Sequence, residues 1–136
     1  MSKQVNNING LCVYSIMVVC DTTISNRTDF LRVISENSGT VIFKFSAEWC
    51  GPCKNIAPDV AEFKKKISDR PDITWYDIDV DDSIQVFGML KTKRIVNGVP
   101  AVLVYLSENE SIYPDEFVLG ANKKDLNVIF DAILAS

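Results

Sequence analysis

Two cysteines separated by two residues give this sequence its clearest chemical signal. Cys50 and Cys53 flank Gly51 and Pro52, after the apolar run 41–45 and before residues with helical spacing. The pair is therefore expected at a junction between a strand and a helix. The N-terminus of a helix offers unpaired backbone N–H groups and the positive end of the helix dipole, which favour a thiolate over a thiol. This arrangement predicts thiol–disulfide exchange.

The composition indicates an ordinary globular domain. The chain has 136 residues, 47% hydrophobic and 24% charged, so a core of normal size needs no framework of disulfides. The net charge is −4, and the one basic run, residues 64–66, lies within a predicted helix and is expected to be a solvated face, so we expect neither nucleic acid nor an anionic membrane as a partner. Histidine is absent, which excludes Cys–His and Ser–His catalysis and imidazole zinc sites. No cofactor is expected.

The cysteine pair could instead be half of a four-cysteine zinc site completed by Cys12 and Cys20. If residues 12–20 form one strand, however, those two sulfurs lie about 26 Å apart at about 3.3 Å per residue. That distance is too long for one metal ion or for a Cys12–Cys20 disulfide. We therefore expect no metal site, and we expect both residues to be buried in the apolar core.

The N-terminal part of the chain has two interpretations. Residues 1–11 are predicted to be a flexible segment, followed by a single domain over residues 12–136. The apolar run 11–20 is shorter than the roughly 20 residues of a membrane span, and no small-x-small cleavage site follows it. We favour a first strand in a cytoplasmic protein. The alternative is a secreted protein in which residues 1–20 act as a signal.

The elements that must position the cysteines alternate along the chain. The apolar segments predicted as strands are 12–21, 41–45, 73–79, 101–107 and 112–119. The segments predicted as helices run from Ser25 or Thr28 to Asn37, over 50–68, over 82–91 and onward from Asn122. Alternation of this kind predicts parallel strands, and the final hairpin makes the last pair antiparallel. The expected fold is an α/β mixed sheet with helices on both faces.

Individual residues refine these elements. Ser25 and Thr28 are candidate N-caps of the first helix, and Asp82 with Gln85 is placed for a capping box at the third. Pro114 puts the last strand at an edge of the sheet, because proline cannot donate to a ladder of hydrogen bonds.

Together with the element order, the run Trp49–Cys50–Gly51–Pro52–Cys53 resembles the thioredoxin family. The resemblance extends over nearly the whole chain and includes Pro58, Val99–Pro100 before a strand and Gly120 before the last helix. It implies a thioredoxin fold whose five strands lie in the order 1-3-2-4-5. It also implies reduction of protein disulfides, with disulfide-containing proteins as substrates and a separate disulfide reductase that recharges the pair.

The resemblance assigns roles to the residues of the motif. Cys50, expected to be partly exposed, attacks a target disulfide, and Cys53 then attacks the mixed disulfide. Gly51 and Pro52 permit the tight geometry, and Pro52 fits an early helical position. Trp49 forms an apolar wall beside the site.

Further residues are assigned to substrate binding by the same resemblance. Pro100 is expected to follow a cis peptide bond and to face the cysteines. The backbone of Val99 pairs with an extended target segment by strand addition, and Gly120 belongs to the same surface. Trp49 and Val99 give an acidic protein an apolar rim. We expect a monomer that can form a weak dimer there.

Lys44 and Trp75 depart from the family pattern. The family usually carries a buried acid at the position of Lys44, thought to help deprotonate the resolving cysteine, and often a lysine at the position of Trp75. Lys44 either runs its alkyl stem past the core into solvent or brings its amine near the cysteines. In the second case an ammonium stabilises a thiolate, whereas a neutral amine serves as a base. Packing is the expected role of Trp75.

Two classes of function remain open at this point. The first is a thioredoxin-type thiol-disulfide oxidoreductase that uses Cys50 and Cys53, with a turnover efficiency that depends on Lys44. The second is a binding or structural module that keeps the fold but turns over weakly. An oxidase or isomerase of secreted proteins would require export.

Overall fold

A computed structural model describes residues 19–20 and 24–136. The predicted flexible segment 1–11 and most of the predicted strand 12–21 lie outside these residues. The assignment of 12–136 to one domain therefore stays a prediction. The element order is β1 Val19–Cys20, α1 Arg27–Ser35, β2 Thr40–Ser46, α2 Gly51–Lys66, β3 Ile73–Asp79, α3 Ile84–Thr92, β4 Ala101–Tyr105, β5 Glu116–Leu119 and α4 Lys123–Ala135.

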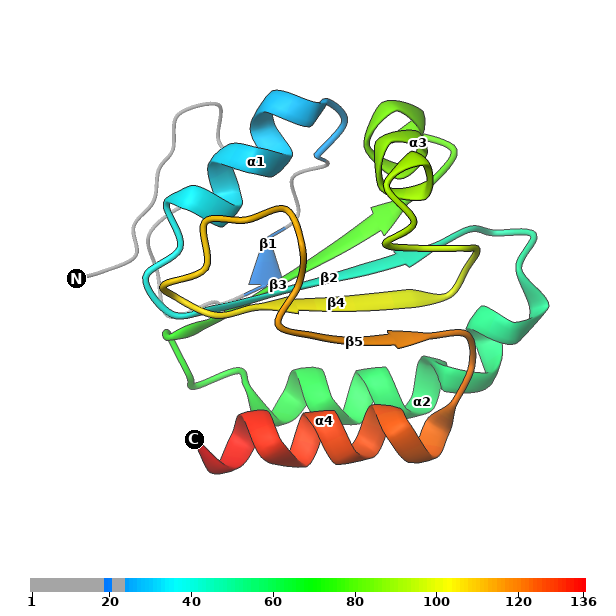
Figure 1. Ribbon diagram of the computed structural model, residues 1–136. Helices are drawn as coiled ribbons and strands as arrows, with labels where there is room; N and C mark the ends of the chain where they lie inside the picture. The colour runs from blue at the N-terminus through cyan, green and yellow to red at the C-terminus, as the bar shows by residue number, and fades with distance from the viewer. Residues whose placement is uncertain (1–18, 21–23) are drawn as a thin grey trace.

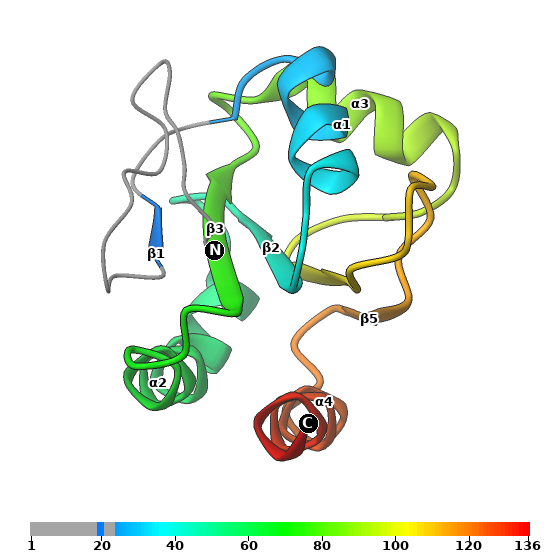
Figure 2. The same ribbon diagram turned by 90° about the vertical axis from the view of Figure 1, so that its left-hand side faces the viewer.

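The sheet has β2 at its centre. Its strands lie in the order β1-β3-β2-β4-β5, as predicted. β2 runs parallel to β3 and antiparallel to β4, and β4 runs antiparallel to the edge strand β5. Figures 1 and 2 show α1 and α3 on one face of the sheet and α2 and α4 on the other. The predicted mixed sheet with helices on both faces is confirmed.

The apolar run in β2 is explained by burial on both faces of the strand. On the α1 and α3 side, Phe43 contacts Phe30 with ring centroids 4.6 Å apart. On the opposite side, Ile42 joins a core in which Phe63 stacks on Phe130 at 3.9 Å and 12°. Alternate side chains of a strand point to opposite faces, so a central strand between two helical layers needs apolar residues at consecutive positions.

The first helix is capped by a residue other than the two predicted candidates. Asn26, rather than Ser25 or Thr28, is the N-cap of α1, and its side-chain oxygen accepts the backbone N–H of Asp29 at 2.8 Å. An N-cap needs extended backbone and a short acceptor. Asn26 has both, with φ −128° and ψ 161°, while Thr28 is already inside the helix.

The predicted capping box of the third helix is also wrong. α3 begins after Ser83, not after Asp82, and no side chain caps it. The hydroxyl of Ser83 is instead buried and donates to the carbonyl of Ile24 at 2.7 Å. The Ser83 hydroxyl thus bonds to a carbonyl far away in the sequence instead of capping the helix, and the sequence pattern did not reveal this partner.

The last two strands are shorter than predicted. β4 ends at Tyr105 rather than at 107, and β5 begins at Glu116 rather than at 112. The carboxylate of Asp115 accepts the backbone N–H of Leu106 at 2.8 Å and the side-chain amide of Asn109 at 2.9 Å. These bonds replace ladder bonds, so 106–115 forms a loop. Pro114 lies in this loop, and β5 is nevertheless the edge strand.

Candidate redox site

The cysteine pair lies where the central strand passes into α2. β2 ends at Ser46, and Cys50 is the N-cap of α2 with extended backbone, φ −87° and ψ 106°. Its Sγ accepts the backbone N–H of Cys53 at 3.1 Å. A sulfur thus takes the place that a Ser or Asp oxygen usually fills at a helix N-terminus. Such a site stabilises negative charge on that sulfur.

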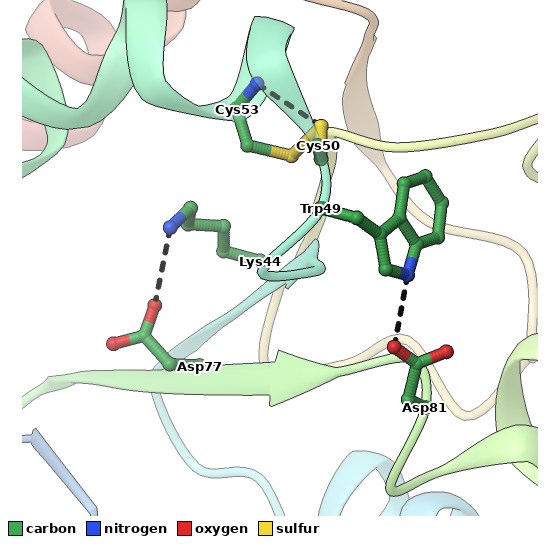
Figure 3. The surroundings of a disulfide bond; sticks show 6 residues. All are labelled: Lys44, Trp49, Cys50, Cys53, Asp77 and Asp81. Atoms are coloured by element: carbon green, nitrogen blue, oxygen red, sulfur yellow. Dashed lines mark hydrogen bonds and ion pairs between the residues drawn. A yellow bond between two sulfur atoms is a disulfide. The ribbon is translucent and has the colours of Figure 1, made fainter.

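Cys50 and Cys53 form a disulfide, with Cα atoms 5.3 Å apart (Figure 3). Both residues are buried, at 3% and 6% exposure, against the core on the α1 and α3 side. The expectation that Cys50 is partly exposed is wrong for this oxidised state. Both side chains pack into the hydrophobic cluster that includes Phe45 and Ala47.

Beside the disulfide, the side chain of Trp49 is held in place although it is 68% exposed. Its Nε1 donates to Oδ2 of Asp81 at 2.9 Å (Figure 3). Asp81 follows β3, and its backbone N–H donates to Oδ1 of Asp79 at 2.8 Å. Asp81 was not among the predicted site residues. β2 and β3 run parallel, so residues that follow the two strands meet at one edge of the sheet, and that signal could have found it.

An apolar groove adjoins Trp49. A cavity of about 320 Å³ lies between Trp49, Val99 and the exposed side of α3, with Ile84 and Phe87 in its wall and Lys91 at its border. Ile84 is one of the large apolar side chains that remain exposed. Apolar surface of this kind next to a reactive group is typical of a binding site.

The segment before β4 reaches the same end of the sheet. The Val99–Pro100 peptide bond is cis. β4 runs antiparallel to β2 with Ala101 opposite Phe45, so Pro100 lies beside the strand end that leads to the cysteines. The carbonyl of Pro100 accepts the N–H of Gly120 at 2.8 Å. Gly120 has φ +86°, which glycine adopts readily. Pro100 and Gly120 are therefore tied together, and Val99 lines the groove.

Lys44 has an ion-pair partner that neither hypothesis from the sequence included. Its Nζ lies 3.8 Å from Oδ1 of Asp77, and its side chain is only 15% exposed. Asp77 stands opposite Lys44 in the register of β2 and β3, and Lys64 of α2 binds the other carboxylate oxygen at 2.7 Å. Lys44 is thus ion-paired rather than free in solvent. Trp75 packs as predicted, fully buried against Phe63 with centroids 5.7 Å apart.

Over residues 19–20 and 24–136, no group of three or more His, Cys, Asp or Glu side chains is arranged to hold a metal ion. No helix in those ranges is long and apolar enough to cross a membrane. Cys12 and the side chain of Cys20 lie outside the described part of the structure.

Comparison with known proteins gives consistent matches. The family model described as Thioredoxin matches residues 21–132. Thioredoxin H5 of Oryza sativa subsp. japonica is 33% identical over 108 residues, which cover 79% of this chain and 72% of that protein. The solution structure of oxidised thioredoxin from Plasmodium falciparum is 31% identical with a TM-score of 0.59, covering 81% of this chain and 94% of that one. Oxidised mitochondrial thioredoxin 3 from Saccharomyces cerevisiae is 27% identical with a TM-score of 0.60, covering 82% and 93%.

Proposed function

This chain belongs to the thioredoxin family and is a thiol-disulfide oxidoreductase, and we propose that it reduces protein disulfides through a dithiol–disulfide cycle of Cys50 and Cys53. The observation that carries this proposal is the disulfide itself, formed at the N-terminus of α2 with Cys50 as the N-cap. A pair that closes a disulfide within one helical turn is well placed to store and release two electrons.

In the first step the thiolate of Cys50 attacks one sulfur of the target disulfide. A bond forms between Cys50 Sγ and that sulfur, and the other target sulfur leaves as a thiolate that takes a proton. The N–H of Cys53, which lies 3.1 Å from Cys50 Sγ in the oxidised state, supports the negative charge on Cys50 before attack.

In the second step Cys53 gives up its proton and attacks Cys50 Sγ. The Cys50–Cys53 disulfide forms, the mixed disulfide breaks, and the second target sulfur leaves as a thiolate that is protonated. The target has gained two electrons and two protons, and the protein dithiol has lost them. A separate disulfide reductase returns two electrons and two protons to the pair.

We assign substrate contact to Trp49, Val99, Pro100 and Gly120. The groove between Trp49 and Val99 supports this assignment, since it is mainly apolar and is lined by Trp49, the residue next to Cys50. An extended target segment that pairs with the backbone of Val99 would gain affinity with little demand on its sequence. Gly51 and Pro52 shape the turn, and the bond from Gly120 to Pro100 positions the segment before β4.

The cellular setting belongs to the same proposal. We place the protein in the cytoplasm, where thiols are kept reduced, and we expect it to act as a monomer. Its partners are disulfide-containing proteins and the recharging reductase. Secretion, with residues 1–20 as a signal, and a weak dimer through the rim of Trp49 and Val99 are the alternatives.

Lys44 favours one competing function. A carboxylate near the resolving cysteine can accept the proton of its thiol, whereas a charged lysine cannot accept a proton. We propose that Lys44 alters the efficiency of turnover. In the extreme case the protein is a binding or structural module that holds its targets but reduces them slowly.

Reduction of insulin by dithiothreitol distinguishes these functions. We expect the wild-type chain to accelerate precipitation of the reduced insulin chains, and the Cys50→Ser and Cys53→Ser variants to lose the acceleration. A wild-type rate no faster than dithiothreitol alone would rule out the reductase and leave the binding module.

A further inference from the structure

Three charged side chains gather on the sheet face that α2 covers, and Figure 3 draws two of them, Lys44 and Asp77, in the surroundings of the disulfide. Lys44 comes from β2, Asp77 from β3 and Lys64 from α2. The carboxylate of Asp77 is shared, with Oδ1 3.8 Å from Nζ of Lys44 and Oδ2 2.7 Å from Nζ of Lys64. We call these three residues the charge triad. Its formal charge is +1, from two ammonium groups and one carboxylate.

The two lysines share the carboxylate unequally. At 2.7 Å, Lys64 makes a short hydrogen bond to Asp77, whereas 3.8 Å exceeds hydrogen-bond distance and leaves Lys44 with a looser ion pair. Lys44 is also the less exposed of the two, at 15% against 30%. Charge on a less exposed group is screened less by water. The surplus positive charge of the triad therefore lies mostly on Lys44.

Lys44 is the member of the triad on the strand that leads to the cysteines. It precedes Cys50 by six residues and stands opposite Asp77 in the sheet. Figure 3 draws Lys44 and Asp77 on the Cys53 side of the disulfide and Trp49 with Asp81 on the Cys50 side. The two triad residues drawn there thus lie on the side of the resolving cysteine.

From this geometry we propose that Lys64 and Asp77 are positioning residues that set the redox balance of Cys50 and Cys53 by controlling how much of the charge on Lys44 is neutralised. The inference rests on the proposed dithiol–disulfide cycle. A disulfide is uncharged. Its reduction by two electrons and one proton gives one thiol and one thiolate, and positive charge nearby stabilises the thiolate and hence the reduced form. Lys64 holds Asp77 away from Lys44 and so favours the dithiol.

Two variants of the triad must therefore act in opposite directions. In Lys64→Gln, the carboxylate of Asp77 turns to Lys44, the remaining pair is neutral, and the equilibrium moves toward the disulfide. In Asp77→Asn, Lys44 keeps its full charge and the equilibrium moves toward the dithiol. Partly exposed groups shift such equilibria by up to about one pKa unit. We expect roughly three- to tenfold in each direction, or about 15–30 mV for a two-electron couple.

The experiment is a redox titration of the full chain against dithiothreitol or glutathione at fixed pH, with the dithiol fraction read by thiol labelling. Asp59→Asn is the matched control, because Asp59 pairs with Lys123 at 3.4 Å between α2 and α4 and should leave the equilibrium unmoved. Lys64→Arg should stay near the wild type because it keeps the charge and the bond to Asp77. In a Lys44→Met background, both triad variants should lose at least most of their effect.

Several results would overturn the inference. These are shifts of the same sign in Lys64→Gln and Asp77→Asn, no shift in either, or shifts that persist without Lys44. Circular dichroism of each variant identifies a change that comes from unfolding, and Lys64→Arg then still tests the charge of Lys64. Insulin reduction by the wild type tests the proposed function separately. A protein that reduces insulin while its triad variants keep the wild-type equilibrium would refute the triad alone.

Discussion

The indole of Trp49 shows how one residue can be exposed and ordered at once. A large apolar ring in water needs a reason for its position, and here the hydrogen bond from Nε1 to Asp81 fixes the ring beside the groove. A bond to a charged acceptor is stronger than one between neutral groups. Asp81 therefore orients the wall against which a target segment would lie, without touching the cysteines.

Removing that acceptor tests the role of Asp81. We expect Asp81→Ala to lower kcat/KM for insulin about fivefold, the equivalent of roughly 1 kcal/mol for one hydrogen bond. Asp81→Asn keeps an acceptor oxygen and should stay within about twofold of the wild type. A small aromatic disulfide, which needs no extended wall, should be reduced at the wild-type rate by both variants. Equal losses with the protein and the small substrate would argue against an orienting role.

At the scale of elements, one buried hydrogen bond ties the start of α3 to the segment before α1. Ser83 Oγ donates to the carbonyl of Ile24 across 59 positions of sequence. Both residues are buried, so water cannot replace the hydroxyl of Ser83 as the donor to the carbonyl of Ile24. α1 and α3 form one layer of the fold, and this bond fixes the chain where it enters that layer.

We expect Ser83→Ala to lower the free energy of unfolding by about 1–3 kcal/mol, the cost of leaving a buried acceptor unpaired. Ser35→Ala is the control, because Ser35 donates to Arg32 at an exposed helix end and its loss should cost about 0.5 kcal/mol or less. Urea unfolding of the two variants measures both values. Equal destabilisation by the two changes would mean that the buried bond of Ser83 stabilises the protein no more than the exposed bond of Ser35.

The same elements show what the sequence could and could not predict. Hydrophobic spacing placed β2, α2, β3 and α4 almost correctly, because burial on a defined face leaves a local pattern. The predicted start of β5 and the predicted caps of α1 and α3 were wrong. Asn26 and Asp115 accept backbone N–H groups nearby in the sequence, where several polar residues could compete, whereas Ser83 donates to the distant carbonyl of Ile24. The cysteine pair was located from its motif. Asp77 and Asp81, which pair with Lys44 and Trp49, were not predicted, because they are more than 30 positions further along the chain and meet those residues only once β2 and β3 pair.

At the scale of the whole molecule, the two helical layers bury aromatic groups that resist ionisation. Burial, and then the negative charge of Glu36, raise the pKa of Tyr76 to about 12. Burial, and then Asp115, also raise the pKa of Tyr105, whose hydroxyl donates to the carbonyl of Ile112 at 2.6 Å. Both phenols stay protonated in the folded protein at pH values where an unfolded chain ionises them.

Linkage fixes the sign of the resulting pH dependence. Between an unfolded pKa of 10.0 and the folded value of about 12, the folded state binds more protons than the unfolded state, so stability falls as the pH rises. The contribution of Tyr76 is complete below pH 10 and is lost above it, at up to about 1.4 kcal/mol per pH unit. We expect the stability of Tyr76→Phe to fall less steeply with rising pH than that of the wild type, when unfolding midpoints are measured from pH 8 to 11. A loss as steep as that of the wild type would contradict the assignment to Tyr76.

The central claim is that Cys50 attacks the target and Cys53 releases it, and a trapping experiment tests it most directly. Cys53→Ser should accumulate a covalent adduct with a disulfide-containing protein, which mass spectrometry locates on Cys50 and a reductant releases. Cys50→Ser should accumulate far less adduct, because Cys53 lies inside α2 and lacks the stabilisation of a thiolate that the N-cap position gives Cys50. Equal trapping by the two variants, or an adduct on Cys53 in the wild-type background, would contradict the proposed order of attack.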